Sequence, residues 1–377
     1  MSRYKLWIVG IRHYIMRKLR DLKFRRWAEI CGEEERSYAD RFGAPELTKE
    51  EHRQIVNAWG GVLARGWMRT GIPAFKAWKM NYGFDAHYVP FSYFFPWVMR
   101  ILNPIDIAKV FSRKELMQTI FHDIKQPDII LRCVGGIIFS HNGSVLNCQE
   151  AVRLIGNVGC DVVVKPSTNS YCGKNVRFVS KKENPSTIES VIQTSGNEYI
   201  VQRALRQVSY TSAFNKSSLN TFRISTLLLN GKFSVLTAML RFGNVGSVVD
   251  NVGAGGACVG INADGTLMPY GFKQSGERIS SWNGVKFDGY QIRNWSGLTE
   301  AARQAHSKIP HCAFVGWDFA LDESEDVNLI EANIDWPGIF FEQLANGRTL
   351  FGERFNEVVE YIKEHPLPMT GMSFTVL

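Results

Sequence analysis

The sequence has no pair of cysteines in a CxxC spacing, and its seven cysteines are scattered and odd in number. This pattern argues against a zinc ribbon and against a disulfide framework, and it favours reduced thiols in the cytosol. The sequence also has no GxxxxGK[ST] loop and no obvious Ser-His-Asp or Cys-His pair. The first absence excludes a Walker-type phosphate site. The second argues against chemistry that depends on a protein nucleophile.

Long hydrophobic runs are absent as well. No stretch approaches the ~20 apolar residues of a membrane span. No uninterrupted apolar core with a small-residue cleavage site marks a signal peptide. Hydrophobic residues nevertheless make up 45% of the 377 residues, so the composition is globular and the chain is long enough for two or three domains. We therefore expect a cytoplasmic protein.

Positive charge is concentrated in the first 26 residues. That segment holds nine Lys and Arg residues and one acid, which accounts for the whole net charge of +8, because 35 basic and 35 acidic residues remain. Ile8, Ile11, Ile15 and Leu19 recur at helical spacing and predict an amphipathic helix. Such a helix either rests on an anionic membrane surface or packs its apolar stripe on the body of the protein. No basic face with interleaved aromatic residues recurs elsewhere, so we expect no nucleic-acid partner.

The pattern of residues changes along the chain. The first part is helical and rich in aromatic residues, with a capping box at Thr48 and Glu51 and a second helix start at Ser112. From about residue 128, short β-rich runs alternate irregularly with helical segments. A hairpin is predicted over residues 221–242, because two such runs meet at Asn230-Gly231. Strands without a regular strand–helix alternation indicate an α+β fold with antiparallel sheets.

The stretch VGWDFALDESEDVNLIEANIDWPG carries the most specific pattern. Glu331 and Asn333 lie two residues apart on a strand and therefore project to the same face. A polar turn separates them from the apolar run that holds Asp318, so a hairpin would bring Asp318 opposite this face. Three hard oxygen ligands suit Mg²⁺ bound together with phosphate oxygens. An ordinary hairpin with polar residues on its solvent face has the same pattern.

Two further stretches carry residues suited to anion binding. Lys165 ends the buried run DVVVK and faces a loop of small residues, 167–173, whose N–H groups can approach phosphate oxygens. A simple hairpin turn there is the alternative. Further along, Arg and Asn side chains stand close to a glycine-rich segment and can hold a carboxylate or a phosphate. Local turn chemistry also favours these residues. The second group consists of Asn220, Arg223, Arg241, Asp250 and Asn251.

In their order along the chain, these stretches resemble the ATP-grasp superfamily, and more narrowly its sugar-transfer-associated branch, found with polysaccharide biosynthesis. The similarity covers about residues 85–360. Its most specific part is the Asp followed by Glu-x-Asn, together with the upstream lysine. The resemblance implies two α+β lobes that clamp ATP. Residues 113–204 would form the small lobe and 205–377 the large lobe, after a helical N-terminal region over 1–112.

The resemblance also implies a role for each matching residue. Two lysines would hold the ATP phosphates, a short loop would cover them, a linker would hold adenine, and three oxygen ligands would bind Mg²⁺. In that order these are Lys114 and Lys165; Ser170 to Gly173; Gln202, Arg203 and Leu205; and Asp318, Glu331 and Asn333. Several relatives have an arginine two residues before the metal-binding Asp, where this chain has Gly316. Arg223 and Arg241 are our candidates for the missing contact to the oxyanion or acyl phosphate.

The activity implied by the resemblance is that of an ATP- and Mg²⁺-dependent carboxylate–amine ligase. Such a ligase forms an amide through an acyl phosphate. The family branch suggests that it joins an amino acid to a sugar carboxylate in capsular or exopolysaccharide biosynthesis. The basic N-terminal segment would then hold it at the inner face of the cell membrane. Two alternatives are a kinase-like phosphoryl transferase with the same fold, and a non-catalytic tethering subunit of a polysaccharide assembly complex.

Overall fold

The computed structural model describes residues 14, 18, 19, 22–63, 68–168, 173–244, 246 and 252–365. Internal contacts divide the chain into two compact units. Unit 1 is formed by Met1–Pro104 together with Gly338–Leu377, and unit 2 by Ile105–Pro337. Residues 338–377 thus group with the N-terminal helices, while the division into 1–112, 113–204 and 205–377 stays a prediction.

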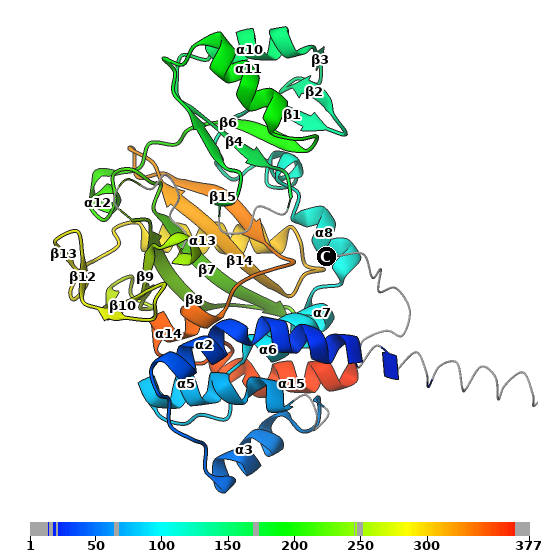
Figure 1. Cartoon of the computed structure of the whole chain (residues 1–377), viewed down its shortest axis with the longest axis vertical. Coiled ribbons are helices and arrows are strands. Elements are labelled where there is room, and N and C mark those ends of the chain that lie inside the picture. Colours follow the sequence, from blue (N-terminus) through cyan, green and yellow to red (C-terminus); the bar gives the residue numbers. More distant parts are fainter. Residues whose placement is uncertain are drawn as a thin grey trace, which may run out of the picture. The chain divides into compact units, whose positions relative to one another are not determined.

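Unit 1 is helical in its described residues (Figure 1). Residues 22–31 form a helix, and Phe94–Val98 form a π-helical turn within an aromatic-rich stretch. The other helices are α2 (Glu33–Arg41), α3 (Lys49–Trp59), α5 (Ile72–Tyr82), α6 (Phe91–Tyr93), α7 (Met99–Leu102), α14 (Phe340–Asn346) and α15 (Phe355–Glu364). None of the helices among the residues described is long and apolar enough to cross a membrane.

Aromatic side chains from both parts of unit 1 form its core. Trp59 is fully buried and lies edge-on to Tyr93 and to Phe355, at ring-centroid distances of 5.4 and 5.0 Å. The side chain of Gln343 accepts from the N–H of Val89 at 3.2 Å and donates to its carbonyl at 2.9 Å. Edge-to-face aromatic pairs and a satisfied buried amide each stabilise such a core, so residues separated widely in sequence are joined in one body.

A buried carboxyl group lies in this core. Glu35, on α2, is 1% exposed, and its Oε1 accepts from the hydroxyl of Tyr88 at 3.2 Å and the N–H of Phe91 at 2.9 Å. Burial raises the pKa of Glu35 from its usual 4.5 to about 8, because these two hydrogen bonds only partly offset the loss of solvation. Glu35 is therefore a neutral acid at pH 7.

The smaller sheet of unit 2 has six strands in the order β3-β2-β1-β6-β4-β5. Helices α10 (Cys148–Gly156) and α11 (Pro185–Thr194) pack against each other and cover one face (Figure 1). Val152 and Ile192 from these helices meet Val162, Val164 and Val201 of the sheet. The strands are β1 (Ile129–Val134), β2 (Ile137–Ser140), β3 (Val145–Leu146), β4 (Val162–Pro166), β5 (Arg177–Val179) and β6 (Tyr199–Arg203).

The larger sheet of unit 2 has seven strands in the order β11-β10-β9-β8-β7-β14-β15. Helix α13 (Trp295–Ser307) packs on it through Leu298, Ala302 and Ala305, and the short helices α8 (Ile105–Phe111), α9 (Met117–Ile120) and α12 (Ser209–Ser212) lie around it. Its strands are β7 (Thr221–Leu229), β8 (Lys232–Phe242), β9 (Ala257–Ile261), β10 (Leu267–Lys273), β11 (Arg278–Ile279), β14 (Phe314–Leu321) and β15 (Val327–Asn333). A separate hairpin pairs β12 (Ser281–Trp282) with β13 (Val285–Lys286).

The predicted α+β class with antiparallel sheets is confirmed. The β7–β8 turn has Asn230 and Gly231 at φ 53° and 74°, the conformation for which this residue pair is favoured. The capping box of Thr48 and Glu51 begins α3 as expected. The predicted cap at Ser112 is wrong. Ser112 closes the preceding helix α8 through its N–H and its hydroxyl, both of which donate to the carbonyl of Ala108.

Replacing Glu35 with glutamine should make unit 1 more stable at high pH. Between about pH 4.5 and about pH 8 the folded wild type binds one proton more than the unfolded chain. Its stability therefore falls by about 1.4 kcal/mol per pH unit as pH rises, and the loss is complete above about pH 8. Glutamine at position 35 cannot ionise, so Glu35→Gln removes this pH-dependent loss of stability.

Thermal melting of wild type and Glu35→Gln across this pH range measures the effect. The gap between the two melting temperatures should widen as pH rises. Glu33→Gln, on the exposed side of the same helix, is the matched control and should follow the wild type. A constant gap between wild type and Glu35→Gln would contradict a buried neutral acid at this position.

Candidate active site

The expected oxygen ligands lie on one face of the β14–β15 hairpin. Asp318 is directly opposite Glu331, and Gly316 is directly opposite Asn333. Opposed residues of an antiparallel pair project to the same side of the sheet, so all three polar side chains share that side. The amide Nδ2 of Asn333 donates to Oδ2 of Asp318 at 3.1 Å. The predicted shared face is thus present, and its use as a metal site stays a prediction.

Two buried arginines contact Asp318. Arg223, opposite Asp318 on β7, donates from Nε to Oδ1 at 2.6 Å and from Nη2 to Oδ2 at 3.2 Å. Arg241, on β8, lies with Nη2 2.9 Å from Oδ2. The guanidinium of Arg241 also donates to the hydroxyl of Thr221 from Nε at 3.1 Å and from Nη2 at 2.6 Å. All three charged side chains are less than 10% exposed.

The two arginines keep Asp318 ionised. Burial alone would raise the pKa of Asp318, but the charges and hydrogen bonds of Arg223 and Arg241 outweigh this effect and hold that pKa below its usual value. Removing one partner of a buried ion pair lowers the free energy of unfolding by about 3–5 kcal/mol, because an uncompensated charge remains in the interior. Asp318 is therefore first an anchor that fixes both arginines at the centre of the larger sheet.

The side chain of Arg223 fills the space beside Gly316. A Cβ atom on Gly316 would lie 3.4 Å from Cδ and 3.6 Å from Nε of Arg223. The sequence left open which arginine replaces the one that several relatives carry at this position. Because the stem of Arg223 already occupies that space, Arg223 is the stronger candidate, and a long side chain at residue 316 would displace it.

Lys114 connects the smaller sheet to β15. Its Nζ lies 2.8 Å from Oε1 of Glu331, and the Lys114 side chain is 7% exposed. The backbone N–H of Lys114 donates to the backbone carbonyl of Ser167, just beyond β4. The lysine begins a 3-10 turn, Lys114–Leu116. An expected phosphate ligand and an expected metal ligand are therefore in contact, as one polyphosphate site requires.

The other predicted nucleotide residues divide between two faces of the smaller sheet. Lys165 is opposite Ile200, and Gln202 is opposite Val163, so Lys165 and Gln202 share one face. Arg203 points to the other face, where its Nη1 is 3.2 Å from Sγ of Cys160. Only the backbone of Arg203 can then serve the shared face. Leu205 follows it, half-buried, in the segment between the two sheets.

The remaining predicted residues have varied placements. Asn220 is buried, and its Nδ2 donates to the carbonyls of Thr211 at 2.8 Å and Asn215 at 2.9 Å, so its amide nitrogen holds the preceding loop together. Gly173 has a φ of 71° at the end of the expected lid loop. Ser170, Asp250 and Asn251 lie outside the described residues. The pairing of both arginines with Asp318 was missed, since no sequence signal links Asp318 to Arg223, 95 positions away, or to Arg241 on another strand.

The donor set fits Mg²⁺ only together with a polyphosphate. Asp318 and Glu331 supply two carboxylates. Asn333 supplies an amide oxygen that faces away from Asp318, because its Nδ2 is the donor to that carboxylate. Over the described ranges, no group of three or more His, Cys, Asp or Glu side chains could hold a metal ion. Mg²⁺ is commonly bound by one or two carboxylates plus substrate phosphates, which matches this set.

The local charge also favours an anion. The cations Lys114, Arg223 and Arg241 outnumber the carboxylates of Asp318 and Glu331, which leaves one net positive charge in the contacting cluster. Lys165 adds another on the face of the smaller sheet that it shares with Gln202. A site with this balance attracts a polyphosphate or a carboxylate substrate.

The chain matches one known protein family. A model of the sugar-transfer associated ATP-grasp family matches residues 98–359, more than half of the chain. No curated protein sequence matches the chain.

Several solved structures resemble it weakly. The D-cycloserine synthetase DcsG has 11% identity and a TM-score of 0.44, over 70% of this chain and 73% of that one. The VanG D-Ala:D-Ser ligase from Enterococcus faecalis has 12% identity and a TM-score of 0.42, over 69% and 63%. The ATP-grasp ligase PsnB, complexed with minimal precursor, Mg and ADP, has 13% identity and a TM-score of 0.40, over 68% and 60%. The chain thus spans less than two thirds of the VanG and PsnB chains.

Replacing Asp318 with asparagine should destabilise unit 2 strongly, by about 3–5 kcal/mol, because two buried arginines lose their counter-charge. Glu300→Gln is the control. It breaks an ion pair with Arg303 whose side chains are about half exposed, and it should therefore cost far less than Asp318→Asn. Urea unfolding of both variants measures the difference. Equal losses would contradict the central role of the buried cluster.

Proposed function

Because the chain belongs to the sugar-transfer-associated ATP-grasp family, we propose that it is an ATP-dependent carboxylate–amine ligase. It forms an amide through an acyl phosphate and joins an amino acid to a sugar carboxylate in capsular or exopolysaccharide biosynthesis. The observation that carries this proposal is the contact cluster of Lys114, Glu331, Asn333, Asp318 and the two arginines. It combines oxygen ligands for a divalent cation with cations for transferring phosphate and developing charge.

The nucleotide is held from both sheets in this proposal. Lys114 and Lys165 neutralise phosphate oxygens of ATP, and Gln202 borders the adenine side on the same face as Lys165. Glu331 and Asn333 provide the oxygen ligands for Mg²⁺, with Asp318 behind them. Bound Mg²⁺ would neutralise phosphate charge. Glu331, now 2.8 Å from Nζ of Lys114, would be free to hold the cation once Lys114 pairs with a phosphate oxygen.

The chemical steps need positioned charges and no protein nucleophile. A carboxylate oxygen of the sugar attacks the γ-phosphorus of ATP, the bond to the bridging oxygen breaks, and ADP leaves. The amine nitrogen then attacks the acyl carbon, inorganic phosphate leaves, and the nitrogen loses a proton. Arg223 and Arg241 stabilise the oxyanion that forms at the acyl carbon. Asp318 orients both guanidinium groups before the substrate arrives, so little reorganisation is needed.

Mg²⁺-dependent ATP binding should depend on Glu331. Wild type should bind ATP more tightly with Mg²⁺ than without, and Glu331→Gln should lose about tenfold or more of the Mg²⁺-dependent affinity, an effect of about 1.4 kcal/mol. Without Mg²⁺ the sign should reverse, because removal of a carboxylate beside Lys114 favours the bare polyanion. Calorimetry measures both. Glu323→Gln, exposed in the turn of the same hairpin, is the matched control. Equal behaviour of the two variants would contradict the proposed nucleotide site.

Phosphate release then tests the reaction class on wild type. A ligase liberates phosphate only when a uronic acid and an amino acid are both present. A kinase-like transferase consumes ATP with one acceptor and releases no phosphate. Wild type that binds no ATP at all would favour the tethering subunit instead.

The basic N-terminal segment supports a place at an anionic membrane surface. In the helix over residues 22–31, Phe24 and Ala28 are buried, whereas Leu22 and Ile30 are 64% and 51% exposed. The side chains of Arg25 and Arg26 are exposed beside them. The helix therefore packs one stripe on unit 1 and presents a second, basic and apolar face, which suits the interface of an anionic bilayer.

Removal of residues 1–21 should release the protein from anionic vesicles. The deletion takes away six basic residues and keeps Phe24, which contacts Trp97 within unit 1. At about 1 kcal/mol per basic residue, binding to phosphatidylserine vesicles should fall by roughly 100-fold or more in cosedimentation. Leu22→Gln with Ile30→Gln should weaken it less, and Val110→Gln, an exposed apolar residue of unit 2, should leave it unchanged. Full binding by the deletion variant would refute the membrane role.

A further inference from the structure

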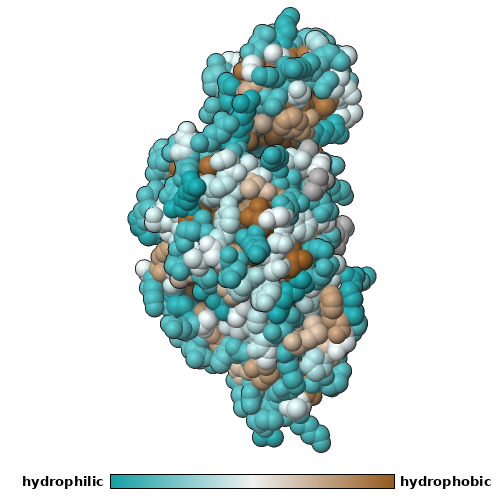
Figure 2. All heavy atoms as spheres, turned by 90° about the vertical axis from the view of Figure 1, so that its left-hand side faces the viewer, coloured by the Kyte–Doolittle hydropathy of each residue, from teal (hydrophilic) through white to brown (hydrophobic). Residues whose placement is uncertain are grey.

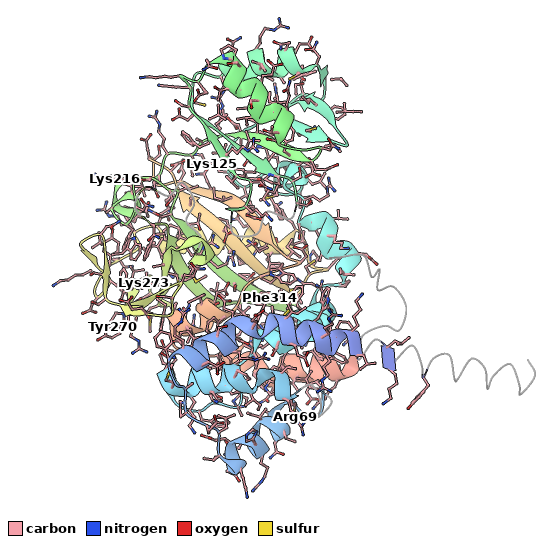
Figure 3. All side chains as sticks on the ribbon, viewed as in Figure 1. Arg69, Lys125, Lys216, Tyr270, Lys273 and Phe314 are labelled. Atoms are coloured by element: carbon pink, nitrogen blue, oxygen red, sulfur yellow. The ribbon has the colours of Figure 1, made fainter. Side chains whose placement is uncertain are left out.

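A hollow of about 550 Å³ opens at the edge of the larger sheet, where β8 and β10 end beside the β12–β13 hairpin. Its lining residues are Asn244, Lys273, Ile279, Ser281, Trp282 and Asn283. Figure 3 shows Lys273 at the end of β10. The hollow is open to solvent, and its lining is mostly polar, with one aromatic ring and one aliphatic side chain.

The hollow lies on the side of β8 opposite the arginine cluster. Along β8, successive side chains alternate between faces, so Arg241 points to the Asp318 side and Phe242 points to the other. The ring of Trp282 packs against Phe242 with centroids 5.3 Å apart. The face of the molecule that carries β12 and β13 is mostly hydrophilic, with apolar side chains in small separate groups (Figure 2). A broad protein-docking surface would need a larger apolar area.

Backbone geometry fixes two of the polar groups in the hollow. Gly255 has a φ of 88°, and a Cβ atom there would lie 2.9 Å from Nδ2 of Asn244, so glycine leaves room for this amide. Asn283 has a φ of 47° in the turn between β12 and β13, and its Nδ2 donates to the carbonyl of Phe214. The side-chain oxygen Oδ1 of Asn283 is thereby oriented as an acceptor.

Trp282 has a hydrogen-bond donor that is unsatisfied within the fold. Its indole Nε1 is buried and has no hydrogen-bond partner in the described part of the chain. Buried donors of this kind nearly always have one. Trp295 offers a direct comparison, because it packs on the same core while its Nε1 donates to the carbonyl of Ala263 at 2.9 Å. The unsatisfied donor of Trp282 thus belongs to a residue that lines the hollow.

The hollow is connected to the site of the proposed reaction. Asn244 precedes the glycine-rich segment that was expected to hold substrate, and Gly253 follows it. Gln274, next to Lys273, donates to the carbonyl of Gly253 at 2.8 Å. The side-chain amide of Asn215 donates to the backbone carbonyl of Asn244 at 3.0 Å, and the backbone carbonyl of Asn215 accepts from the side chain of Asn220. Asn220 directly precedes Thr221, whose hydroxyl accepts from Arg241. Both flanks of the segment therefore meet at the hollow, and hydrogen bonds lead from there to the arginines.

We propose that this hollow is a saccharide-binding subsite. The apolar face of a sugar ring packs on the indole of Trp282. The amides of Asn244 and Asn283 and the hydroxyl of Ser281 bind sugar hydroxyl groups. A polyhydroxylated ring fits better than a polyphosphate, because the one cation, Lys273, already pairs with Glu277 at 2.9 Å. The assignment of this sugar as part of the ligase substrate rests on the proposed function.

Indole NMR of the full-length protein tests the subsite directly. The chain has ten tryptophans, and in a sample with ¹⁵N-labelled indoles the signals of Trp282 and Trp295 are identified by their loss in Trp282→Phe and Trp295→Phe. The probes are D-glucuronate, D-galacturonate and N-acetyl-D-glucosamine, with inorganic phosphate and ADP as the anionic comparison. At least one saccharide should shift the Trp282 signal and leave the Trp295 signal in place.

Variants separate binding from folding. Ser281→Tyr fills the hollow from an exposed position and should weaken the saccharide titration by at least tenfold, while Trp295→Phe should leave it unchanged. The subsite is overturned if no saccharide shifts Trp282, if Ser281→Tyr titrates as wild type does, or if phosphate or ADP produces the shift instead. Mg²⁺-dependent ATP binding without any saccharide effect would refute the subsite alone. Saccharide binding without ATP binding would leave the subsite standing and refute the ligase.

Discussion

The larger sheet is organised around one carboxylate that two arginines neutralise. Asp318 on β14, Arg223 on β7 and Arg241 on β8 come from three adjacent strands, and their charges are all buried. A slip of one residue in either pairing would move a charged side chain to the face that holds Phe222, Leu240 and Trp317. The charge pairing therefore selects the strand register as strictly as the hydrophobic pattern does. This register in turn determines where the side chains of β14 and β15 lie.

The same pairing explains how the site is preorganised. Because Asp318 already accepts from both guanidinium groups and from Asn333, the arginines and the amide are held in place by the protein itself. Glu331 is the more exposed carboxylate, with 31% of its side chain exposed against 6% for Asp318, and its Oε1 contacts Nζ of Lys114 at 2.8 Å. The contact between Glu331 and Lys114 therefore forms the exchangeable part. A second lysine, Lys125, joins the same hairpin from the side of the smaller sheet, at 2.7 Å from Asp322 and 2.6 Å from Asp326 (Figure 3). The two sheets of unit 2 are thus connected through β15 and its turn.

The sequence was informative where the signal is local. Asn230-Gly231 defines its hairpin through backbone conformation, and the two-residue spacing of Glu331 and Asn333 determines that they share a face. It was uninformative where the cause is tertiary. Neither the pairing of Arg223 with Asp318 nor the contact of Lys114 with Glu331 follows from any spacing, because each joins separate elements. Ser112 shows a third case. Serine is a common helix-capping residue, but the hydroxyl of Ser112 donates to the carbonyl of Ala108 at the end of α8 and does not cap the next helix.

The composition of unit 1 from two distant parts of the chain has a consequence for synthesis on the ribosome. The helices around Trp59 and Val89 emerge early, while their partners Phe355 and Gln343 follow much later; Val89 and Gln343 are 254 residues apart. At ~5–20 residues per second this interval is roughly 10–50 s. During it the aromatic core of unit 1 lacks one wall, whereas unit 2, which is continuous in sequence, can complete its sheets. We therefore expect unit 2 to complete its fold before unit 1, whose aromatic core stays partly uncovered until residues 338–365 have emerged.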